Sequence, residues 1–183
     1  MTPLLLDEYI DNQDVVLEHL MGLEWLEATE ARKEYFMSDL PRSYTYGREP
    51  NQRTYHSSPY TQRIEKIRSM LNVAGSSFNV CFLNRYDNQK NQLGWHADDS
   101  PEMDHNHPIA VISFGAEREL WVKPKEFKGV IPPEWRFKLP NGSLLIMPAG
   151  FQIGHLHKIP RCDHECGIRI SLTFRRYIDG GSR

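Results

Sequence analysis

The stretch Arg169-Ile-Ser-Leu-Thr-Phe-Arg175, near the end of the chain, alternates polar and apolar side chains along its whole length. Successive side chains of a β-strand point to opposite faces, so this period of two predicts a strand with Ile170, Leu172 and Phe174 on one face. The other face carries two arginines, which are costly to bury unless an anion meets them. The pattern alone also allows the reverse, with the arginines in solvent. The histidines described below favour arginines that face inward.

Upstream of this strand, short segments with strand-like composition are separated by turn signals such as Asn141-Gly142. Their β-branched and aromatic residues and their spacing predict an array of short strands rather than helices. The predicted strands are Phe78–Tyr86, Ile109–Phe114, Glu119–Val122, Trp135–Leu139 and Ser143–Met147.

The first third of the chain has a different pattern. Apolar residues at near-helical spacing predict helices over residues 13–34 and from Pro59 to Leu71, with a loop or loose hairpin at 35–57. Two helices before many short strands predict a mainly β fold with flanking helices (α+β). We expect a double-stranded β-helix (jelly-roll) barrel with an N-terminal helical buttress. The 183 residues then form one domain, with buttress and substrate lid over 1–75 and the barrel over 76–177.

Composition places few limits on function. Hydrophobic residues make up 39% of the chain and charged residues 25%, as in ordinary globular proteins, and no apolar run approaches the length of a membrane span. The N-terminus lacks the basic region of a signal peptide, and three cysteines do not suggest a disulfide framework. We expect an intracellular monomer without membrane contact, cytoplasmic or, in a eukaryote, nuclear.

Charge is distributed unevenly, although the net charge is only −2. Residues 1–34 carry nine acids and two bases, whereas residues 42–68 carry six bases and two acids. One basic face is compatible with a polyanionic partner. The plain alternative is a solvated helix followed by a basic loop.

The segment His96-Ala-Asp98 places two metal-binding side chains on the same side of an extended strand. A third ligand can come from His155 or His157, which have the same parity, so alternation does not choose between them. Two histidines and one carboxylate on one face of an octahedral metal leave three positions open, as in non-haem Fe(II) oxygenases. The nearby Cys162, His164 and Cys166 also allow a small zinc site, although their spacing is irregular.

Several motifs, in order over roughly residues 40–177, make the chain resemble the AlkB family of Fe(II)/2-oxoglutarate-dependent dioxygenases. Within that family it is most similar to the eukaryotic DNA-repair type. The core motifs are Asn84-Arg-Tyr86, Gly94-Trp-His-Ala-Asp-Asp99, Pro108–Ala116, Asn141–Leu145, His157-Lys-Ile-Pro160 and Arg169–Arg175. Tyr46-Gly47 and Arg53-Thr-Tyr55 are similar to the substrate lid of the family. The sequence departs from the family at Ser171, where many members carry Asn.

The resemblance implies a role for each matching residue. The Fe(II) ligands would be His96, Asp98 and His157. The residues that bind the co-substrate 2-oxoglutarate would be Asn84, Tyr86, Arg169 and Arg175. Arg169 with Tyr86 would hold the distal carboxylate, since a guanidinium binds a carboxylate through two parallel hydrogen bonds. O2 would be the second co-substrate.

The resemblance also implies the reaction. An N-methyl group of a nucleobase such as N1-methyladenine or N3-methylcytosine in single- or double-stranded DNA would be oxidised, releasing formaldehyde, succinate and CO2. The base must leave the helix to react. Tyr46 and Tyr55 would grip the base, Arg53 with Arg42 and Arg48 would contact phosphates, and Asp99 would meet the positive charge of the lesion.

Three alternatives stay open. The enzyme could demethylate RNA or tRNA instead of DNA. The same fold could hydroxylate a protein or a small molecule, because fold alone does not determine the substrate. A non-catalytic barrel that binds nucleic acid is a third possibility, although it would have no need for the complete set of metal and arginine residues.

Overall fold

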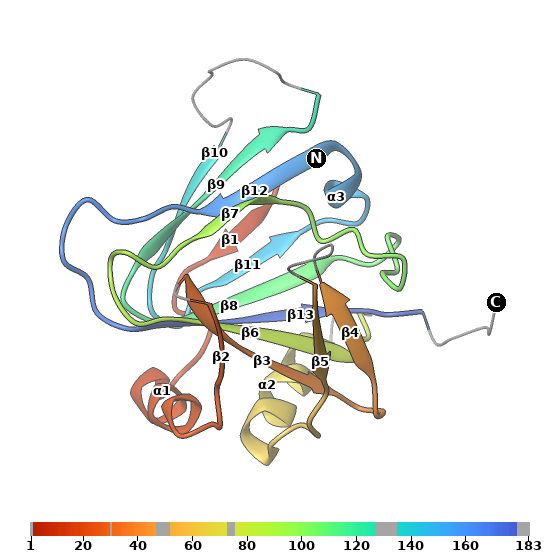
Figure 1. The fold of residues 1–183 in the computed structure, drawn as a ribbon, viewed down its shortest axis with the longest axis horizontal. Helices are drawn as coiled ribbons and strands as arrows, with labels where there is room; N and C mark the ends of the chain where they lie inside the picture. Colours follow the sequence, from red (N-terminus) through yellow and green to blue (C-terminus); the bar gives the residue numbers. More distant parts are fainter. Residues whose placement is uncertain (1, 30, 47–51, 73–75, 127–134, 179–183) are drawn as a thin grey trace.

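The computed structural model describes residues 2–29, 31–46, 52–72, 76–126 and 135–178. Two antiparallel sheets lie one over the other, with the helices α1 (Gln13–Met21) and α2 (Gln62–Asn72) outside the larger sheet (Figure 1). The larger sheet has the order β1 (Leu4–Leu6), β11 (Leu144–Met147), β8 (Ile109–Gly115), β13 (Arg169–Arg175), β6 (Val80–Tyr86), β3 (Arg32–Ser38) and β2 (Leu26–Thr29). The smaller sheet has the order β10 (Trp135–Leu139), β9 (Arg118–Pro124), β12 (His155–Ile159) and β7 (Leu93–His96).

Two further elements complete the described structure. The hairpin of β4 (Ser43–Tyr46) and β5 (Arg53–His56) forms a separate two-stranded sheet beside β3. The short helix α3 (Phe151–Gly154) leads into β12. Two facing antiparallel sheets with helices on one side confirm the predicted mainly β, jelly-roll architecture. No helix in the described part of the chain has the length and apolarity needed to cross a membrane.

The core has two layers, one on each side of the larger sheet. The outer layer joins the helices to the sheet and includes Leu20 of α1 and Ile64 of α2. The inner layer lies between the two sheets and includes Val122 of β9 and Leu145 of β11. Burial of these apolar side chains is the main favourable contribution to folding.

Strand β13 lies in the middle of the larger sheet, between β8 and β6, and every one of its residues is buried. Ile170, Leu172 and Phe174 belong to the outer layer beneath the helices. Arg169 and Arg175, on the opposite face of the strand, therefore face the interior between the sheets, which is the direction that the histidines favoured. Two guanidinium groups inside a barrel require an anionic partner.

The helix predicted over residues 13–34 is wrong after Met21. Helix α1 ends there, and Gly22 caps it with backbone bonds to Glu18, His19 and Leu20. The chain then forms β2 and β3, and β3 pairs with β6 from Lys33↔Arg85 to Ser38↔Val80. An open edge of the sheet offers a full ladder of backbone hydrogen bonds, which outweighs the weak helical preference of the sequence.

The other elements predicted for the first third of the chain agree better with the structure. The region 35–57 contains the end of β3 and the β4–β5 hairpin, so the expected hairpin is confirmed. The helix expected from Pro59 begins at Gln62, and the Thr61 hydroxyl accepts the Ile64 amide at 3.4 Å. Strand β1 was not predicted; it pairs with β11, so residues before 75 add strands to the barrel sheet as well as helices to its outer face. The division of the chain into one domain with a boundary near residue 75 stays a prediction.

The turn after β8 depends on a glycine. Gly115 has φ +85°, and a Cβ at this position would lie 2.2 Å from the carbonyl oxygen of Ile168. We expect Gly115→Ala to lower the free energy of unfolding by at least about 1–3 kcal/mol, because both the backbone conformation and the contact become unfavourable. Urea denaturation measures this loss. The control Gly154→Ala meets no atom within 4 Å, and an equal loss in both variants would contradict the explanation.

Candidate metal and co-substrate site

The predicted metal ligands meet at the edge between β7 and β12. His96 and His157 are cross-strand partners, with ring centroids 4.2 Å apart, and Asp98 lies two residues after the end of β7. The Asp98 carboxylate lies 3.7 Å from His96 Nε2 and 4.0 Å from His157 Nε2. The ligand atoms of all three residues lie within 4.8 Å of one another, which is compatible with one shared metal ion.

The competing histidine lies elsewhere. The ring of His155 stacks on Phe151 with a centroid distance of 4.4 Å and also contacts Trp135. Of the two candidate histidines, the structure therefore places His157 with His96 and Asp98. Cys162 and Cys166 lie 3.2 Å apart, but among the described residues the only potential metal cluster of three or more ligands is the one around Asp98.

The protonation of the ligands suits a cation. Burial lowers the pKa of His96, and burial together with His96 lowers the pKa of His157 to about 3, so both rings are neutral near pH 7. His96 Nδ1 lies 2.9 Å from the carbonyl oxygen of Gly94, which can only accept, so Nε2 is left free to bind a metal. Burial favours protonated Asp98, but Arg175, His157 and His96 more than offset it and keep its pKa below the usual value.

Arg175 holds the metal-binding carboxylate in place. Its Nη2 donates to Asp98 Oδ1 at 2.8 Å, and both side chains are buried. A buried pair of this kind fixes geometry, and removal of either partner leaves an uncompensated charge. Arg175 therefore orients a metal ligand, while its Nε has no hydrogen-bond partner and stays available to a bound molecule.

A small internal cavity joins the metal ligands to the predicted co-substrate residues. It is lined by His96, Asp98 and His157 together with Asn84, Tyr86, Arg169 and Arg175. The structure therefore brings together all seven residues that the sequence assigns to metal and co-substrate. Asn84 and Tyr86 come from β6, where Tyr86 pairs with Arg169 and Asn84 with Ser171 of β13.

Arg169 is the clearest evidence that the cavity fits an acid. Arg169 is 1% exposed, its Nη2 donates to the Ser113 hydroxyl at 2.9 Å, and its guanidinium lies over the Tyr86 ring at 5.3 Å. Nε and Nη1 are buried without hydrogen bonds, and burial lowers the pKa of the guanidinium to about 10. An unpaired buried cation costs several kcal/mol. A carboxylate accepting from Nε and Nη1 would remove that cost, which fits the distal end of 2-oxoglutarate.

A second cavity opens beside the metal ligands and has aromatic and charged walls. Tyr44, Tyr55 and Phe82 supply its aromatic surface, and His96 and Asp98 lie at its base. The Tyr44 and Tyr55 rings stack with a centroid distance of 6.4 Å, and Tyr44 lies edge-on to Phe82 at 4.7 Å. The sequence predicted Tyr55 here but missed Tyr44, which alternates with the polar Ser43 and Thr45, and Phe82, which lies in an apolar run.

The same cavity contains an unpredicted acid, Glu34 of β3. Glu34 is buried, and its carboxylate accepts hydrogen bonds from Arg32 and from the Tyr55 hydroxyl. Arg53 Nη1 lies 3.7 Å from the same carboxylate. Burial and the hydrogen bond to Glu34 raise the pKa of Tyr55 to about 12. Glu34 was missed because residues 13–34 were assigned to a helix.

The remaining predicted substrate residues are placed differently. Asp99 is half-exposed and binds Lys125 Nζ at 2.7 Å, away from the residues that line the aromatic cavity. Arg53 is partly buried beside Glu34 and Tyr55. Tyr46 ends β4 opposite Arg53, and its side chain lies outside the described part of the structure, as does Arg48.

Comparisons with known proteins agree with this geometry. Residues 8–175 match the model of the "2OG-Fe(II) oxygenase superfamily". The chain is 32% identical over 181 residues to human "Alpha-ketoglutarate-dependent dioxygenase alkB homolog 3", covering 91% of this chain and 62% of the relative. It is 30% identical over 152 residues to "DNA oxidative demethylase ALKBH2" of Bos taurus, covering 80% of this chain and 53% of the relative.

The fold is also similar to a solved structure, "The structure of OsALKBH1", with a TM-score of 0.65. The alignment covers 95% of this chain and 97% of that chain at 16% identity, which supports the fold alone. The chain spans about half to three fifths of the length of the two curated relatives.

Proposed function

The chain belongs to the AlkB family within the 2OG-Fe(II) oxygenase superfamily, and on that premise we propose that it oxidatively demethylates alkylated nucleobases. The observation that carries the proposal is the aromatic cavity lined by Tyr44, Tyr55 and Phe82, which reaches the metal ligands His96 and Asp98. Flat aromatic walls suit a nucleobase that has left its stack, because every base has a face on which an aromatic ring can pack.

The residues of the inner cavity would bind the cofactor set. His96, Asp98 and His157 would hold Fe(II), and Arg169 would bind one carboxylate of 2-oxoglutarate. When bound, iron, 2-oxoglutarate and O2 supply the oxidising power, and 2-oxoglutarate becomes succinate and CO2. Arg175 keeps the Asp98 carboxylate ionised and oriented throughout.

The product follows from the chemistry of the methyl group. Insertion of one oxygen atom into an N-methyl C–H bond gives an N-hydroxymethyl base. The N–C bond of this product then breaks, the nitrogen regains its ordinary valence, and formaldehyde leaves. Burial of the reaction centre between the sheets limits access of water to the reacting groups.

Mass spectrometry of methylated oligonucleotides tests the proposal. DNA and RNA strands with N1-methyladenine or N3-methylcytosine would be incubated with the protein, Fe(II), 2-oxoglutarate and ascorbate. We expect loss of a methyl mass with the native protein and none with His96→Ala. Succinate formation without any demethylated strand would overturn the nucleic-acid proposal and leave a protein or a small molecule as substrate.

The carboxylate of the aromatic cavity gives a prediction on specificity. N1-methyladenine and N3-methylcytosine carry a positive charge, and Glu34 is an acid placed among the aromatic side chains. We expect Glu34→Gln to lower kcat/KM for these lesions at least about 10-fold, since interactions with a charged partner contribute about 1.5–3 kcal/mol. A neutral lesion such as N3-methylthymine should lose much less.

Asp99 provides the matched control for Glu34. It was the acid that the sequence assigned to the lesion, but its carboxylate pairs with Lys125 and is 50% exposed. We expect Asp99→Asn to change the ratio between charged and neutral lesions by less than about 3-fold, as for a solvent-exposed pair. A larger change in Asp99→Asn than in Glu34→Gln would restore the role first assigned to Asp99.

A further inference from the structure

The outer face of the smaller sheet carries an unusual row of side chains. Strands β9 and β12 direct Leu120, Val122 and Ile159 into the core, so the residues between them face outward. Two partly buried indoles lie on this outer face, among basic side chains. The outward residues that matter here are Arg136 and Lys138 of β10, Trp121 and Lys123 of β9, Lys158 of β12 and Trp95 of β7.

These side chains form a ladder of alternating cations and indoles across all four strands. Arg136 lies over the Trp121 ring at 4.3 Å, and Lys158 lies over the same ring at 4.3 Å. Lys158 is also 4.8 Å from the Trp95 ring, as is Lys123. The register explains the order, because Trp121 pairs with Arg136 on one side and with Lys158 on the other. We call this set of five residues the cation–indole ladder.

The ladder concentrates positive charge that carboxylates do not neutralise. Within the described ranges, Lys123, Arg136, Lys138 and Lys158 form no ion pair with an acid. Glu119 lies opposite Lys138 in the strand pair, and its carboxylate accepts the Trp121 indole N–H at 2.6 Å. Cations held this close repel one another, and an anion that bridges them would be favoured.

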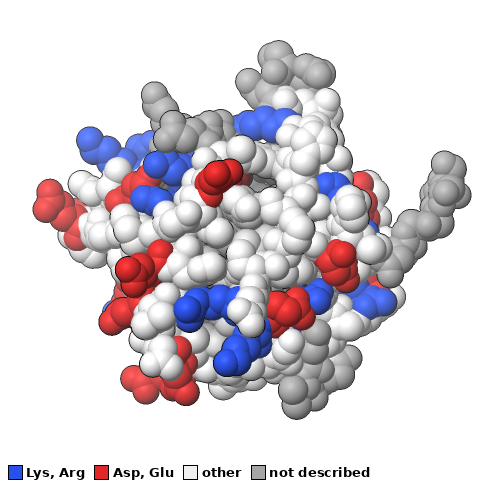
Figure 2. All heavy atoms as spheres, turned by 90° about the horizontal axis from the view of Figure 1, so that it is seen from below, with Lys and Arg blue, Asp and Glu red and all other residues white. Residues whose placement is uncertain are grey.

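The segment 42–68, which the sequence singled out as basic, has a different environment. Arg68 pairs with Glu65 at 2.8 Å and lies 3.7 Å from Asp39, and Arg42 lies 3.9 Å from Asp39. On the face seen from below in Figure 2, where α1 and α2 lie, both blue and red side chains occur, and red groups adjoin blue ones near the lower centre. The composition of a segment therefore does not show which of its cations are paired with acids.

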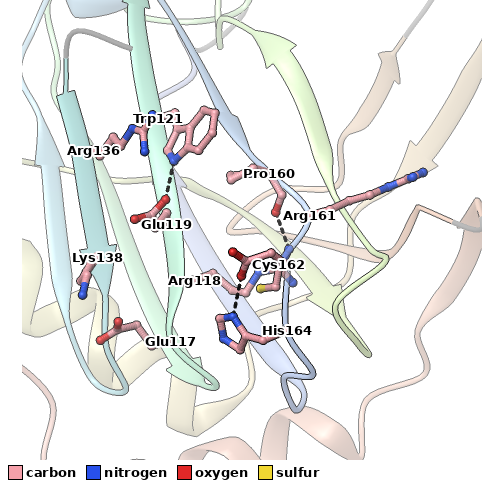
Figure 3. A pocket seen from close by; sticks show the side chains of 11 residues that line it. Glu117, Arg118, Glu119, Trp121, Arg136, Lys138, Pro160, Arg161, Cys162 and His164 are labelled. Carbon is pink, nitrogen blue, oxygen red and sulfur yellow. Dashed lines mark hydrogen bonds and ion pairs between the residues drawn. The ribbon is translucent and has the colours of Figure 1, made fainter. Parts of the chain in front are cut away.

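A hollow adjoins the β10 end of the ladder. It has a volume of about 580 Å³, inside the range of about 300–1,000 Å³ that is typical of small-ligand sites. Figure 3 shows Arg136 beside the Trp121 ring at one end and Lys138 further along the same strand. Glu117, Glu119 and Asp163 also line it, and Glu119 and Asp163 already accept hydrogen bonds from Trp121 and His164.

Several ladder residues are close in sequence to the predicted metal ligands, because both sets lie on the same strands. Lys123 is two residues before Lys125, which binds Asp99, the residue after the predicted ligand Asp98. Trp95 and Lys158 directly adjoin the ligands His96 and His157 but point to the opposite face of the sheet. The ladder and the predicted metal ligands therefore lie on opposite faces of the same two strands, at neighbouring positions.

We propose that the cation–indole ladder and Lys138 form a second binding surface for single-stranded nucleic acid, outside the cavity that oxidises the methyl group. The cations would contact successive phosphates, and the adjoining hollow would hold one nucleotide against Trp121. A basic track with interleaved aromatic rings is the arrangement that single-strand binding proteins use. The inference rests on the proposed function for its substrate class, but its test does not require catalysis.

The first experiment measures binding alone. Arg136→Gln/Lys138→Gln removes two exposed cations that take no part in the metal or co-substrate site. The matched control is Arg63→Gln/Lys66→Gln, two exposed cations on α2, on the other side of the molecule (Figure 1). The probe is an unmethylated DNA strand of about 20 nucleotides, longer than a site of about 4–16. Fluorescence anisotropy across a salt series gives the affinity and its salt dependence.

The two variants have different expected results. Each lost phosphate contact should reduce the slope of log affinity against log salt by about 0.7, so the ladder variant should lose about 1.4. Its affinity at low salt should fall as well, whereas the control should bind like the native protein. Equal affinity and slope in the ladder variant and the native protein would overturn the proposal, as would equal losses in both variants.

A second experiment relates the surface to turnover. A methylated strand of about 5 nucleotides, near the lower limit of single-strand sites, can fill the cavity without reaching the hollow. We expect the ladder variant to raise KM for a methylated strand of about 20 nucleotides and to leave the short strand unchanged. A purely structural role would lower the melting temperature and impair both strands. If the native protein demethylates neither strand, the proposed function fails while the binding result still decides the surface.

Discussion

Replacing His157 with alanine is expected to abolish both Fe(II) binding and 2-oxoglutarate turnover. His157 Nε2 is one of three ligand atoms that lie within 4.8 Å of one another, and β12 supplies it from across the strand pair. Loss of residues that merely support a ligand costs about 10–100-fold in affinity or activity, so loss of a ligand should exceed 100-fold. Isothermal titration with Fe(II) under anaerobic conditions and succinate release measure the two effects.

His155→Ala is the matched control, because His155 is on the same strand with the same parity. Its ring stacks on Phe151 rather than facing Asp98, so this variant should keep metal binding and most turnover. Some loss of thermal stability is expected, since the stacked ring contributes packing. Metal binding that survives in His157→Ala and disappears in His155→Ala would reverse the assignment of the third ligand.

Replacing Arg169 with methionine is expected to remove 2-oxoglutarate binding without destabilising the protein. Two charge-assisted hydrogen bonds to a carboxylate contribute about 3–6 kcal/mol, so KM for 2-oxoglutarate should rise at least about 100-fold. The protein without ligand loses a buried guanidinium whose Nε and Nη1 have no partners, at nearly unchanged volume. Its melting temperature should stay equal or rise, because methionine, unlike arginine, carries no charge that has to be desolvated on burial.

Arg175→Met should behave in the opposite way. Arg175 neutralises buried Asp98, so its removal leaves a carboxylate without its main partner and should cost about 3–5 kcal/mol of stability.

A thermal-shift measurement tests the role of Arg169. Added 2-oxoglutarate should raise the melting temperature of the native protein and fail to do so in Arg169→Met. If Arg169→Met retained normal KM for 2-oxoglutarate, the distal carboxylate would have to bind elsewhere in the cavity.

The fold was predictable where one periodicity dominates. The segment 169–175 alternates without a break, and the structure places it as β13, in the middle of the larger sheet. The strand predicted at Trp135–Leu139 also has the predicted bounds. The segment 13–34 shows the limit, since its apolar residues fit a helix as far as Met21 while the rest pairs with β6. Pairing with a distant strand leaves little trace in local sequence.

The candidate site also has residues that local sequence predicts and residues that it does not. His96 and Asp98 are two residues apart, and Arg169 and Arg175 share one face of one strand, so local geometry places each pair. The aromatic cavity is built from β3, β4, β5 and β6, and its acid Glu34 reaches it only because β3 joins the sheet. Asp99 was assigned to the lesion from its neighbour in sequence, whereas the structure turns it toward Lys125.

The sequence by itself determined the strand alternation, the metal-ligand pair and the placement of both arginines on one face of a strand, because each depends on residues within a few positions of one another. The tertiary structure decided which histidine completes the metal site, which acid lies in the aromatic cavity and which cations stay unneutralised. These outcomes depend on contacts between strands far apart in the chain. Burial and pairing in the folded state set the energy of a charge, and composition cannot report either one.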